Sequence, residues 1–186
     1  MLKGSHMSNQ SLPSHASVVV LGGGIMGCST LYHLAELGVG DAILLERNQL
    51  TSGTTWHSAA QVRALRSTLN LTNLIKYSTS LYAKLEEETG QSTGWINRGS
   101  LSIATNAERM THIARQEALA KLFGVRANAI SPDEAKERWP LMNTNDVVGA
   151  VWSPDDGRVS PSDVCAALIK GAKANGARVF ENTGVT

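Results

Sequence analysis

Three glycines and one acidic residue have the spacing of a dinucleotide-binding turn. Gly22, Gly24 and Gly27 follow an apolar run at residues 18–21. A second apolar run ends at Glu46, which lies 19 residues after Gly27. Because glycine has no Cβ, the chain can turn tightly and approach a pyrophosphate, and a following helix directs N–H groups at the anion. An acid at this distance accepts hydrogen bonds from ribose hydroxyls. The pattern predicts a dinucleotide site, with a glycine-rich turn of another α/β protein as the alternative.

The loop after Glu46 ends in a histidine that is a second candidate for chemistry. Residues 47–58 are polar, contain glycine and show no periodicity. Loops this close to a nucleotide site often carry function. Fully extended, the segment from Glu46 to His57 would span roughly 36–40 Å, enough to reach the far end of a long cofactor. His57 is therefore either a functional group or a loop histidine hydrogen-bonded near Trp56.

Two further pairs of charged residues have both a chemical and a structural interpretation. Arg63 and Arg66 are three residues apart and could together reach a carboxylate, although a place at the surface or the edge of the core is favoured. Asp155 and Asp156 could act as paired carboxylates. Neighbouring side chains on a turn diverge, so turn formation is the favoured interpretation of this pair.

Composition excludes several classes of protein. The chain has 186 residues, 42% hydrophobic and 18% charged, with a net charge of +1, which indicates neither a nucleic-acid partner nor a membrane partner. No apolar stretch approaches the roughly 20 residues that span a bilayer. Cys28 and Cys165 lack metal-ligand spacing, and no metal site is expected. We interpret both as small buried residues in a reducing compartment, with the cytoplasm as the expected location.

The expected elements alternate between helix and strand, which predicts an α/β fold. A helix is expected over residues 71–89 with Leu71, Leu74 and Leu85 on its apolar face. Two strands are expected to meet at a turn within residues 94–104, and a hairpin-type turn is expected at residues 154–157. The other expected helices follow Gly27, a capping box of Thr105 with Glu108, a second box at Ser131, and the cap at Ser160.

These elements predict a Rossmann-like βαβ domain interrupted by part of a mainly-β domain. Residues 1–16 comprise an expression scar and a disordered lead-in, and residues 17–93 form the dinucleotide domain with the helix that follows it. Residues 94–160 belong to the inserted substrate domain, and residues 161–186 return as a helix and a strand of the first sheet. The chain stops just after that strand, so we expect a truncated piece of a longer protein that is inactive alone.

Three stretches resemble one enzyme family. Residues 50–57, Leu-Thr-Ser-Gly-Thr-Thr-Trp-His, are similar to the loop after the acid in sarcosine and dimethylglycine dehydrogenases. Residues 85–90 with 94–96 and 99–101 resemble the next helix and hairpin of that family. Residues 139–143, followed by Asp155-Asp156-Gly157 and Pro161, resemble a later segment. The chain is thereby identified as a member of the D-amino-acid-oxidase-like FAD-dependent oxidoreductases from about Val18 onward.

The resemblance implies a flavoprotein that oxidatively demethylates an N-methyl amino acid. It implies hydride transfer to FAD, a place in one-carbon metabolism, and an electron-transfer flavoprotein or oxygen as the electron acceptor. It further implies that His57 is bonded covalently to the flavin, and leaves tetrahydrofolate open as a cofactor of the full-length protein. In a eukaryote the mitochondrial matrix replaces the cytoplasm as the expected location. The catalytic residues remain unassigned.

The resemblance also extends the set of candidate cofactor-binding residues beyond the glycine turn. This set is Gly22, Gly24, Gly27, Glu46, Arg47, Thr51, Ser52, Thr55 and His57. The three hydroxyl residues of the loop either donate to phosphate or ribitol oxygens or simply form turns. Where relatives often continue Trp-His with Ala-Ala-Gly or Thr-Ala-Gly, this chain has Ser58-Ala59-Ala60. The missing glycine alters how closely the backbone can pass the flavin ring.

Three alternative functions remain open at this point. The first is a catalytically silent regulatory relative with the same fold, against which His57 argues, since a regulator has little need of a covalent tether. The second is an amine oxidase of the 4-methylaminobutanoate oxidase type. The third is a nicotinamide-dependent dehydrogenase, which the interruption after a single βαβ unit disfavours.

Overall fold

The computed structural model describes residues 11–186, and the chain forms two compact units within it. The first unit contains the residues up to Ser58, residues 87–91 and residues 161–186, and the second contains residues 59–86 and 92–160. The expected domain ranges placed residues 59–86 with the dinucleotide domain, whereas their contacts group them with the second unit. The expression scar and part of the expected lead-in lie outside the described residues.

The first unit is built on a parallel three-stranded sheet. Its strands have the order β1-β2-β9, and Leu44 of the central strand pairs with Val20 on one side and Val179 on the other. Helix α1 connects β1 to β2, and helix α5 leads into β9. The return of the chain to this sheet makes the second unit an insertion in an α/β domain, as predicted. The elements are β1 (Val19–Leu21), α1 (Ile25–Glu36), β2 (Ile43–Leu45), α5 (Pro161–Ala174) and β9 (Arg178–Phe180).

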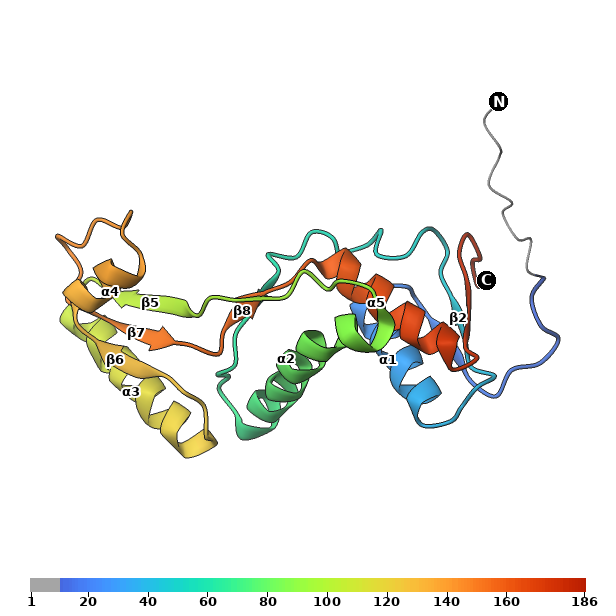
Figure 1. The fold of residues 1–186 in the computed structure, drawn as a ribbon, viewed down its shortest axis with the longest axis horizontal. Coiled ribbons are helices and arrows are strands. Elements are labelled where there is room, and N and C mark those ends of the chain that lie inside the picture. The colour runs from blue at the N-terminus through green and yellow to red at the C-terminus, as the bar shows by residue number, and fades with distance from the viewer. Residues whose placement is uncertain (1–10) are drawn as a thin grey trace, which may run out of the picture. The chain divides into compact units, whose positions relative to one another are not determined.

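Helices α1 and α5 pack side by side and form the core of the first unit (Figure 1). A Cβ on Gly171 would come within 2.6 Å of the Tyr32 ring, so only glycine permits this close approach of the two helices. The return helix expected within residues 161–186 is confirmed as α5, and its buried residues include Val164, Ala167, Leu168, Gly171 and Ala172. Cys28 and Cys165 are 0% exposed, in agreement with their interpretation as buried residues.

The second unit contains two antiparallel three-stranded sheets. The larger has the order β5-β7-β6 and is covered by α3, as Figure 1 shows, and the smaller has the order β3-β8-β4. Its hydrophobic core gathers residues such as Ala104, Ile113 and Val151. The elements are β3 (Gln61–Val62), α2 (Leu69–Thr89), β4 (Ile96–Asn97), β5 (Ser100–Ala104), α3 (Ala107–Phe123), β6 (Asn128–Ile130), α4 (Pro132–Arg138), β7 (Gly149–Ser153) and β8 (Gly157–Arg158), with the last turn of α2 in the first unit.

The strand positions were predicted better than the strand partners. The turn at residues 154–157 does not close a hairpin, because β7 pairs with β5 and β6 while β8 pairs with β3 and β4. For the same reason β4 and β5 lie in different sheets. The crossing from one sheet to the other requires tight backbone at Gly99 and Gly157: a Cβ would come within 2.0 Å of Trp152 and 2.6 Å of the Ile96 carbonyl oxygen, respectively.

Two helix predictions need correction. Helix α3 begins one residue later than expected, because the side chain of Asn106, rather than a Thr105 capping box, accepts a hydrogen bond of 2.8 Å from the Arg109 N–H. In α2, Leu85 is buried as predicted, but Leu71 and Leu74 are 48% and 58% exposed among the described residues. The capping box at Ser131 is confirmed.

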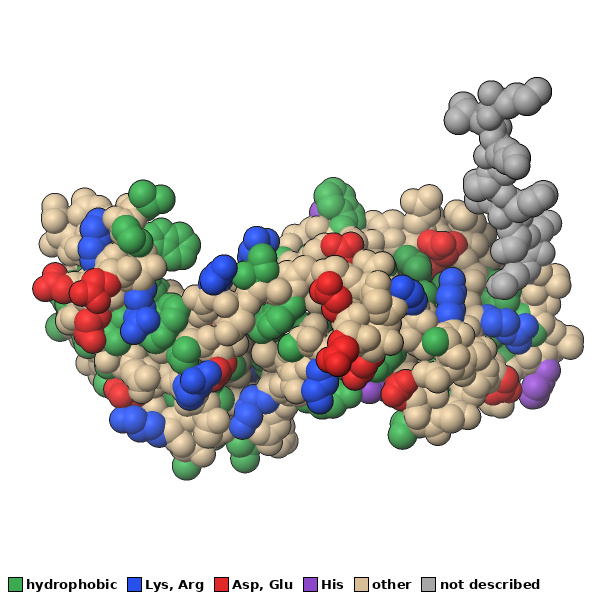
Figure 2. All heavy atoms as spheres, viewed as in Figure 1, with side chains coloured by type: hydrophobic (Ala, Val, Ile, Leu, Met, Phe, Trp, Pro, Cys, Tyr) green, Lys and Arg blue, Asp and Glu red, His purple; other side chains and the backbone are tan. Residues whose placement is uncertain are grey.

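Large hydrophobic side chains reach the surface in both units. Figure 2 shows hydrophobic side chains (green) at the surface of the face that it draws. Among the described residues, the most exposed large hydrophobic ones include Met26, Leu37 and Leu141. A search of the described residues finds no helix with the length and apolar composition that a membrane crossing requires.

Candidate functional site

The glycine turn between β1 and α1 is shaped by contacts that exclude side chains. Gly22 has φ +100°, a left-handed conformation that favours glycine, and its N–H donates to the Leu45 carbonyl over 2.9 Å. A Cβ on Gly27 would lie 1.9 Å from the Gly22 carbonyl oxygen. A Cβ on Gly24 would lie 3.0 Å from the Thr55 hydroxyl oxygen. The turn therefore needs glycine at the predicted positions and leads straight into the N-terminus of α1.

Glu46 follows β2 and binds the glycine turn. Its carboxylate accepts hydrogen bonds of 2.6 Å from the Gly23 N–H and 2.8 Å from the Asn48 N–H. These two bonds lower the pKa of Glu46, and the neighbouring Arg47 charge adds to the effect. The group is therefore an anion at neutral pH. A carboxylate has about four lone-pair directions, so two bonds leave Glu46 able to accept from ribose hydroxyls.

The loop at residues 47–58 is folded into successive turns against the glycine turn rather than extended. The Thr51 N–H donates to the Gly23 carbonyl over 2.9 Å, and the Thr51 hydroxyl lies 3.3 Å from that of Ser162. The Leu50 N–H donates to the Glu181 carboxylate over 2.7 Å. The loop therefore does not span the roughly 36–40 Å that its fully extended length would allow.

Thr55 is the buried residue of this loop. It is 8% exposed, and its hydroxyl oxygen accepts a 3.0 Å hydrogen bond from the Ile25 N–H at the start of α1. An α-helix leaves its first N–H groups without intrahelical acceptors. With Ile25 bonded to Thr55, the N–H groups of Met26 and Gly27 are the remaining first-turn donors. Donors at a helix N-terminus suit the negative charge of a diphosphate.

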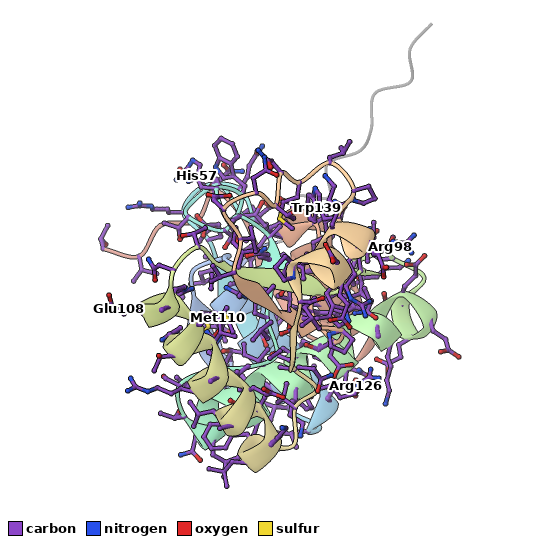
Figure 3. All side chains as sticks on the ribbon, turned by 90° about the vertical axis from the view of Figure 1, so that its left-hand side faces the viewer. His57, Arg98, Glu108, Met110, Arg126 and Trp139 are labelled. Atoms are coloured by element: carbon purple, nitrogen blue, oxygen red, sulfur yellow. The ribbon has the colours of Figure 1, made fainter. Side chains whose placement is uncertain are left out.

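The other candidate residues of the loop are exposed. The rings of His57 and Trp56 lie 4.0 Å apart at an interplanar angle of 40°, and His57 lies at the periphery in Figure 3. Arg47 and Ser52 are also exposed. The structure thus brings together the three glycines, Glu46, Thr51 and Thr55, and it leaves Arg47, Ser52 and His57 at the surface of the first unit.

The residues of the glycine turn fit an adenine dinucleotide such as FAD. Gly24 keeps the turn open where a methyl group would press on Thr55, and the first-turn donors of α1 offer N–H groups to a diphosphate. Glu46 supplies an ionised acceptor beside them. The residues that would hold the cofactor are therefore Gly22, Gly24, Gly27 and Glu46, with Thr51 and Thr55 supporting the turn.

A cavity of about 300 Å³ in the second unit contains several cationic or polar groups. Its lining includes Arg63, Arg66, His112 and Gln116. Arg63 donates to the Ser102 hydroxyl over 2.6 Å, and its Nε lies 3.8 Å from the Asp156 carboxylate. Arg63 is thus held at the edge of the core, as favoured from sequence, whereas Arg66 lines the cavity as a side chain able to bind a carboxylate.

Asp155 and Asp156 have different roles although they are neighbours. Asp155 forms an ion pair with Arg126 near the surface. Asp156 is 3% exposed and accepts hydrogen bonds of 2.7 Å from the Ala64 N–H and 2.5 Å from the Ser100 hydroxyl. Sequence reasoning missed this cluster, because its members are far apart in the chain and no local pattern joins them.

Comparison with known proteins shows the family. Residues 17–186 match the profile of the DAO family, described as FAD dependent oxidoreductase. The chain is 48% identical to the mitochondrial sarcosine dehydrogenase of Mus musculus over 96% of its own length and 20% of that protein. It is 38% identical to the pyruvate dehydrogenase phosphatase regulatory subunit of Mus musculus, over 94% of its length and 20% of that protein. The chain thus spans about a fifth of these curated relatives.

Solved structures show the same fold. L-proline dehydrogenase from P. horikoshii superposes with a TM-score of 0.88 at 31% identity, covering 94% of this chain and 46% of that one. This structural match covers residues of both units and is not confined to the glycine turn. The chain belongs to the DAO family of FAD-dependent oxidoreductases.

Proposed function

We propose that this chain is the FAD-binding part of an enzyme that oxidatively demethylates an N-methyl amino acid such as sarcosine or dimethylglycine. The flavin would accept a hydride from the N-methyl carbon, and water would release the resulting one-carbon unit as formaldehyde unless tetrahydrofolate captures it. Electrons would leave to an electron-transfer flavoprotein or to oxygen. The name of the mouse relative supports the mitochondrial location over the cytoplasm if the source is a eukaryote.

The observation that carries the proposal is the ionised Glu46 beside the glycine turn in a chain of the FAD-dependent family. Glu46 and the first-turn N–H donors of α1 would bind the ADP half of FAD, at the ribose and the diphosphate respectively. The 48% identity with a sarcosine dehydrogenase supports the substrate class.

We further propose that His57 holds the flavin covalently. The imidazole is exposed and sits on a loop that is hydrogen-bonded to the glycine turn, so it is accessible to a bound cofactor. The bond would join an imidazole nitrogen to the 8α-methyl carbon of the flavin. One proton would leave from the methyl C–H and one from the imidazole N–H, and the two electrons left on the flavin would pass to the electron acceptor. Arg66, in the cavity of the second unit, is the candidate group for the substrate carboxylate.

The experiment that tests these proposals uses the full natural chain. The purified protein is denatured in acid, and flavin fluorescence that stays with the polypeptide is measured for wild type and for His57→Ala. We expect fluorescence on wild type only. Equal fluorescence on both variants would exclude His57 as the tether, and wild-type protein without any FAD would exclude the flavoenzyme.

Turnover separates the enzyme from its alternatives. Sarcosine, dimethylglycine and 4-methylaminobutanoate are each supplied with an artificial electron acceptor, and formaldehyde is measured. A regulatory relative, supported by the 38% identity with a phosphatase regulatory subunit, would bind FAD without turning over any of the three. Arg66→Gln should raise KM for the amino acids more than it lowers kcat if Arg66 binds their carboxylate.

A further inference from the structure

We propose that Thr55 is a positioning residue: its hydroxyl latches the loop that carries His57 onto the N-terminus of α1. The inference rests on the proposed function for the role of His57, but the latch itself concerns only contacts within the first unit. Thr55 lies two residues before His57, in the one part of the loop that is buried.

The latch is a single side-chain hydrogen bond between segments distant in sequence. The Thr55 Oγ1 atom accepts from the Ile25 N–H at 3.0 Å, across 30 residues. Helix α1 has Gly24 at its N-cap, and Gly24 has no side chain that could cap the helix. Thr55 therefore supplies from another segment a side-chain acceptor for the first helical N–H, whereas Ser, Thr, Asp or Asn at the N-cap would accept from the second or third.

The position of Gly24 restricts where the hydroxyl can sit. A Cβ on Gly24 would come within 3.0 Å of Thr55 Oγ1, which is tighter than an ordinary van der Waals contact. The glycine thus leaves the space that the threonine hydroxyl fills. The same glycine that shapes the turn for a diphosphate permits the loop to close onto the helix.

A short turn links the Thr55 hydrogen bond to the position of His57. The Ser58 N–H donates to the Thr55 carbonyl over 3.2 Å, so Thr55 forms the base of a turn whose two central residues are Trp56 and His57. Their rings lie 4.0 Å apart. Because the central residues are exposed and the base is buried, the Thr55 contact limits how far the imidazole can move.

The loop is also attached to the glycine turn by a backbone hydrogen bond at Thr51. Thr51 is held by its own N–H, which donates to the Gly23 carbonyl, and a substitution at Thr51 leaves that bond possible. Removal of the Thr55 hydroxyl would instead free the loop after Thr51 and leave the Ile25 N–H without its acceptor. A nucleophile whose productive geometry is populated less often reacts more slowly in proportion.

The first arm of the test measures the latch without the tether. In the full natural chain carrying His57→Ala and saturated with FAD, hydrogen exchange is followed for the peptide covering residues 47–58. Thr55→Val, which keeps the shape and removes the hydroxyl, should speed exchange at the Ile25 amide and in residues 52–58 by about fivefold, the usual effect of a lost cap. Thr55→Ser should restore wild-type exchange, and Thr54→Val at the exposed neighbour should change nothing.

The second arm measures the consequence for His57. On the wild-type background, the rate at which added FAD becomes resistant to acid denaturation should fall about fivefold in Thr55→Val, recover in Thr55→Ser and stay unchanged in Thr54→Val. Unchanged exchange in Thr55→Val would overturn the latch. Faster exchange with an unchanged tethering rate would overturn the positioning role.

The two arms also distinguish this inference from the proposed function. If wild-type protein never retains flavin after acid, the tether at His57 fails, whereas the exchange arm still decides whether Thr55 holds the loop. Far-UV circular dichroism establishes that each variant folds. If Thr55→Val does not fold, Gly24→Ala provides the second variant, since its methyl group would displace the Thr55 hydroxyl. Loop exchange in that variant that is no faster than in wild type would overturn the latch.

Discussion

Ala60 is held in a backbone conformation that suits glycine. Its φ is +62°, in the left-handed region where a Cβ approaches the following carbonyl oxygen. It occupies the position at which the resemblance described in the sequence analysis leads us to expect glycine. Ala60→Gly should therefore stabilise the protein by about 1 kcal/mol, measured as the free energy of unfolding in urea. The matched control is Ala59→Gly, which has no such strain to relieve and should lose about 0.5–1 kcal/mol through chain entropy. Equal effects at both positions would contradict the explanation.

Glu46 gives the stability of the protein a pH dependence with a definite sign. Hydrogen bonds from the Gly23 and Asn48 N–H groups lower its pKa in the folded chain below its ordinary value of 4.5. The stabilisation is thus fully present above 4.5 and is lost as pH falls through the folded pKa. Wild-type melting temperature should drop more steeply below pH 4.5 than that of Glu46→Gln, which cannot titrate. Parallel curves for the two proteins would show that Glu46 does not contribute.

At the scale of elements, one carboxylate links two segments of the second unit that no strand pairing joins directly. Asp156 accepts from the Ala64 N–H next to β3 and from the Ser100 hydroxyl of β5. Asp156→Ala should destabilise the second unit by about 2–4 kcal/mol, because buried donors lose their acceptor. Asp155→Ala removes only a partly exposed ion pair with Arg126 and should cost less than about 1 kcal/mol. Chemical denaturation followed by tryptophan fluorescence measures both. A cost for Asp155→Ala as large as that for Asp156→Ala would contradict this division.

This contrast also shows how far sequence reasoning reaches. Helix α5, the capping box at Ser131 and the glycine turn were predictable, because their signals lie within a few neighbouring residues. The burial of Asp156 was not, since it depends on Ala64 and Ser100, which are 92 and 56 residues away. The same limit explains the incorrect hairpin at residues 154–157: turn composition marks where a strand ends but not which sheet receives the next one.

The candidate site follows the same rule. Gly22 and Gly27 have local reasons for being glycine, a left-handed φ and a close approach to the Gly22 carbonyl oxygen, whereas Gly24 approaches the distant Thr55. The bond between Thr55 and the Ile25 N–H spans 30 residues, so sequence could nominate Thr55 only as one of several loop hydroxyls. The structure distinguishes it from Ser52, which is exposed.

At the scale of the whole molecule, the two cysteines report on the first unit. Cys28 of α1 and Cys165 of α5 are 0% exposed. Hydrogen bonding of the Cys28 thiol to Cys165 and then burial raise the pKa of Cys28, so it remains protonated and unreactive at neutral pH. Labelling by an aromatic disulfide reagent must therefore wait until α1 and α5 separate.

Thiol labelling consequently measures how strongly FAD stabilises the unit that binds it. The experiment uses the full natural protein with His57→Ala, so that FAD remains exchangeable, and with every Cys other than Cys28 and Cys165 replaced by Ser. We expect slow labelling of both thiols. Free FAD at about 100 times its Kd should slow labelling by about a hundredfold, because the ligand must leave before the unit opens. Gly27→Ala, whose methyl group would collide with the Gly22 carbonyl oxygen, should abolish this protection. Rapid labelling of native protein would contradict the burial of the two thiols, and a rate independent of FAD would place the cofactor away from the unit that contains Glu46 and the glycine turn.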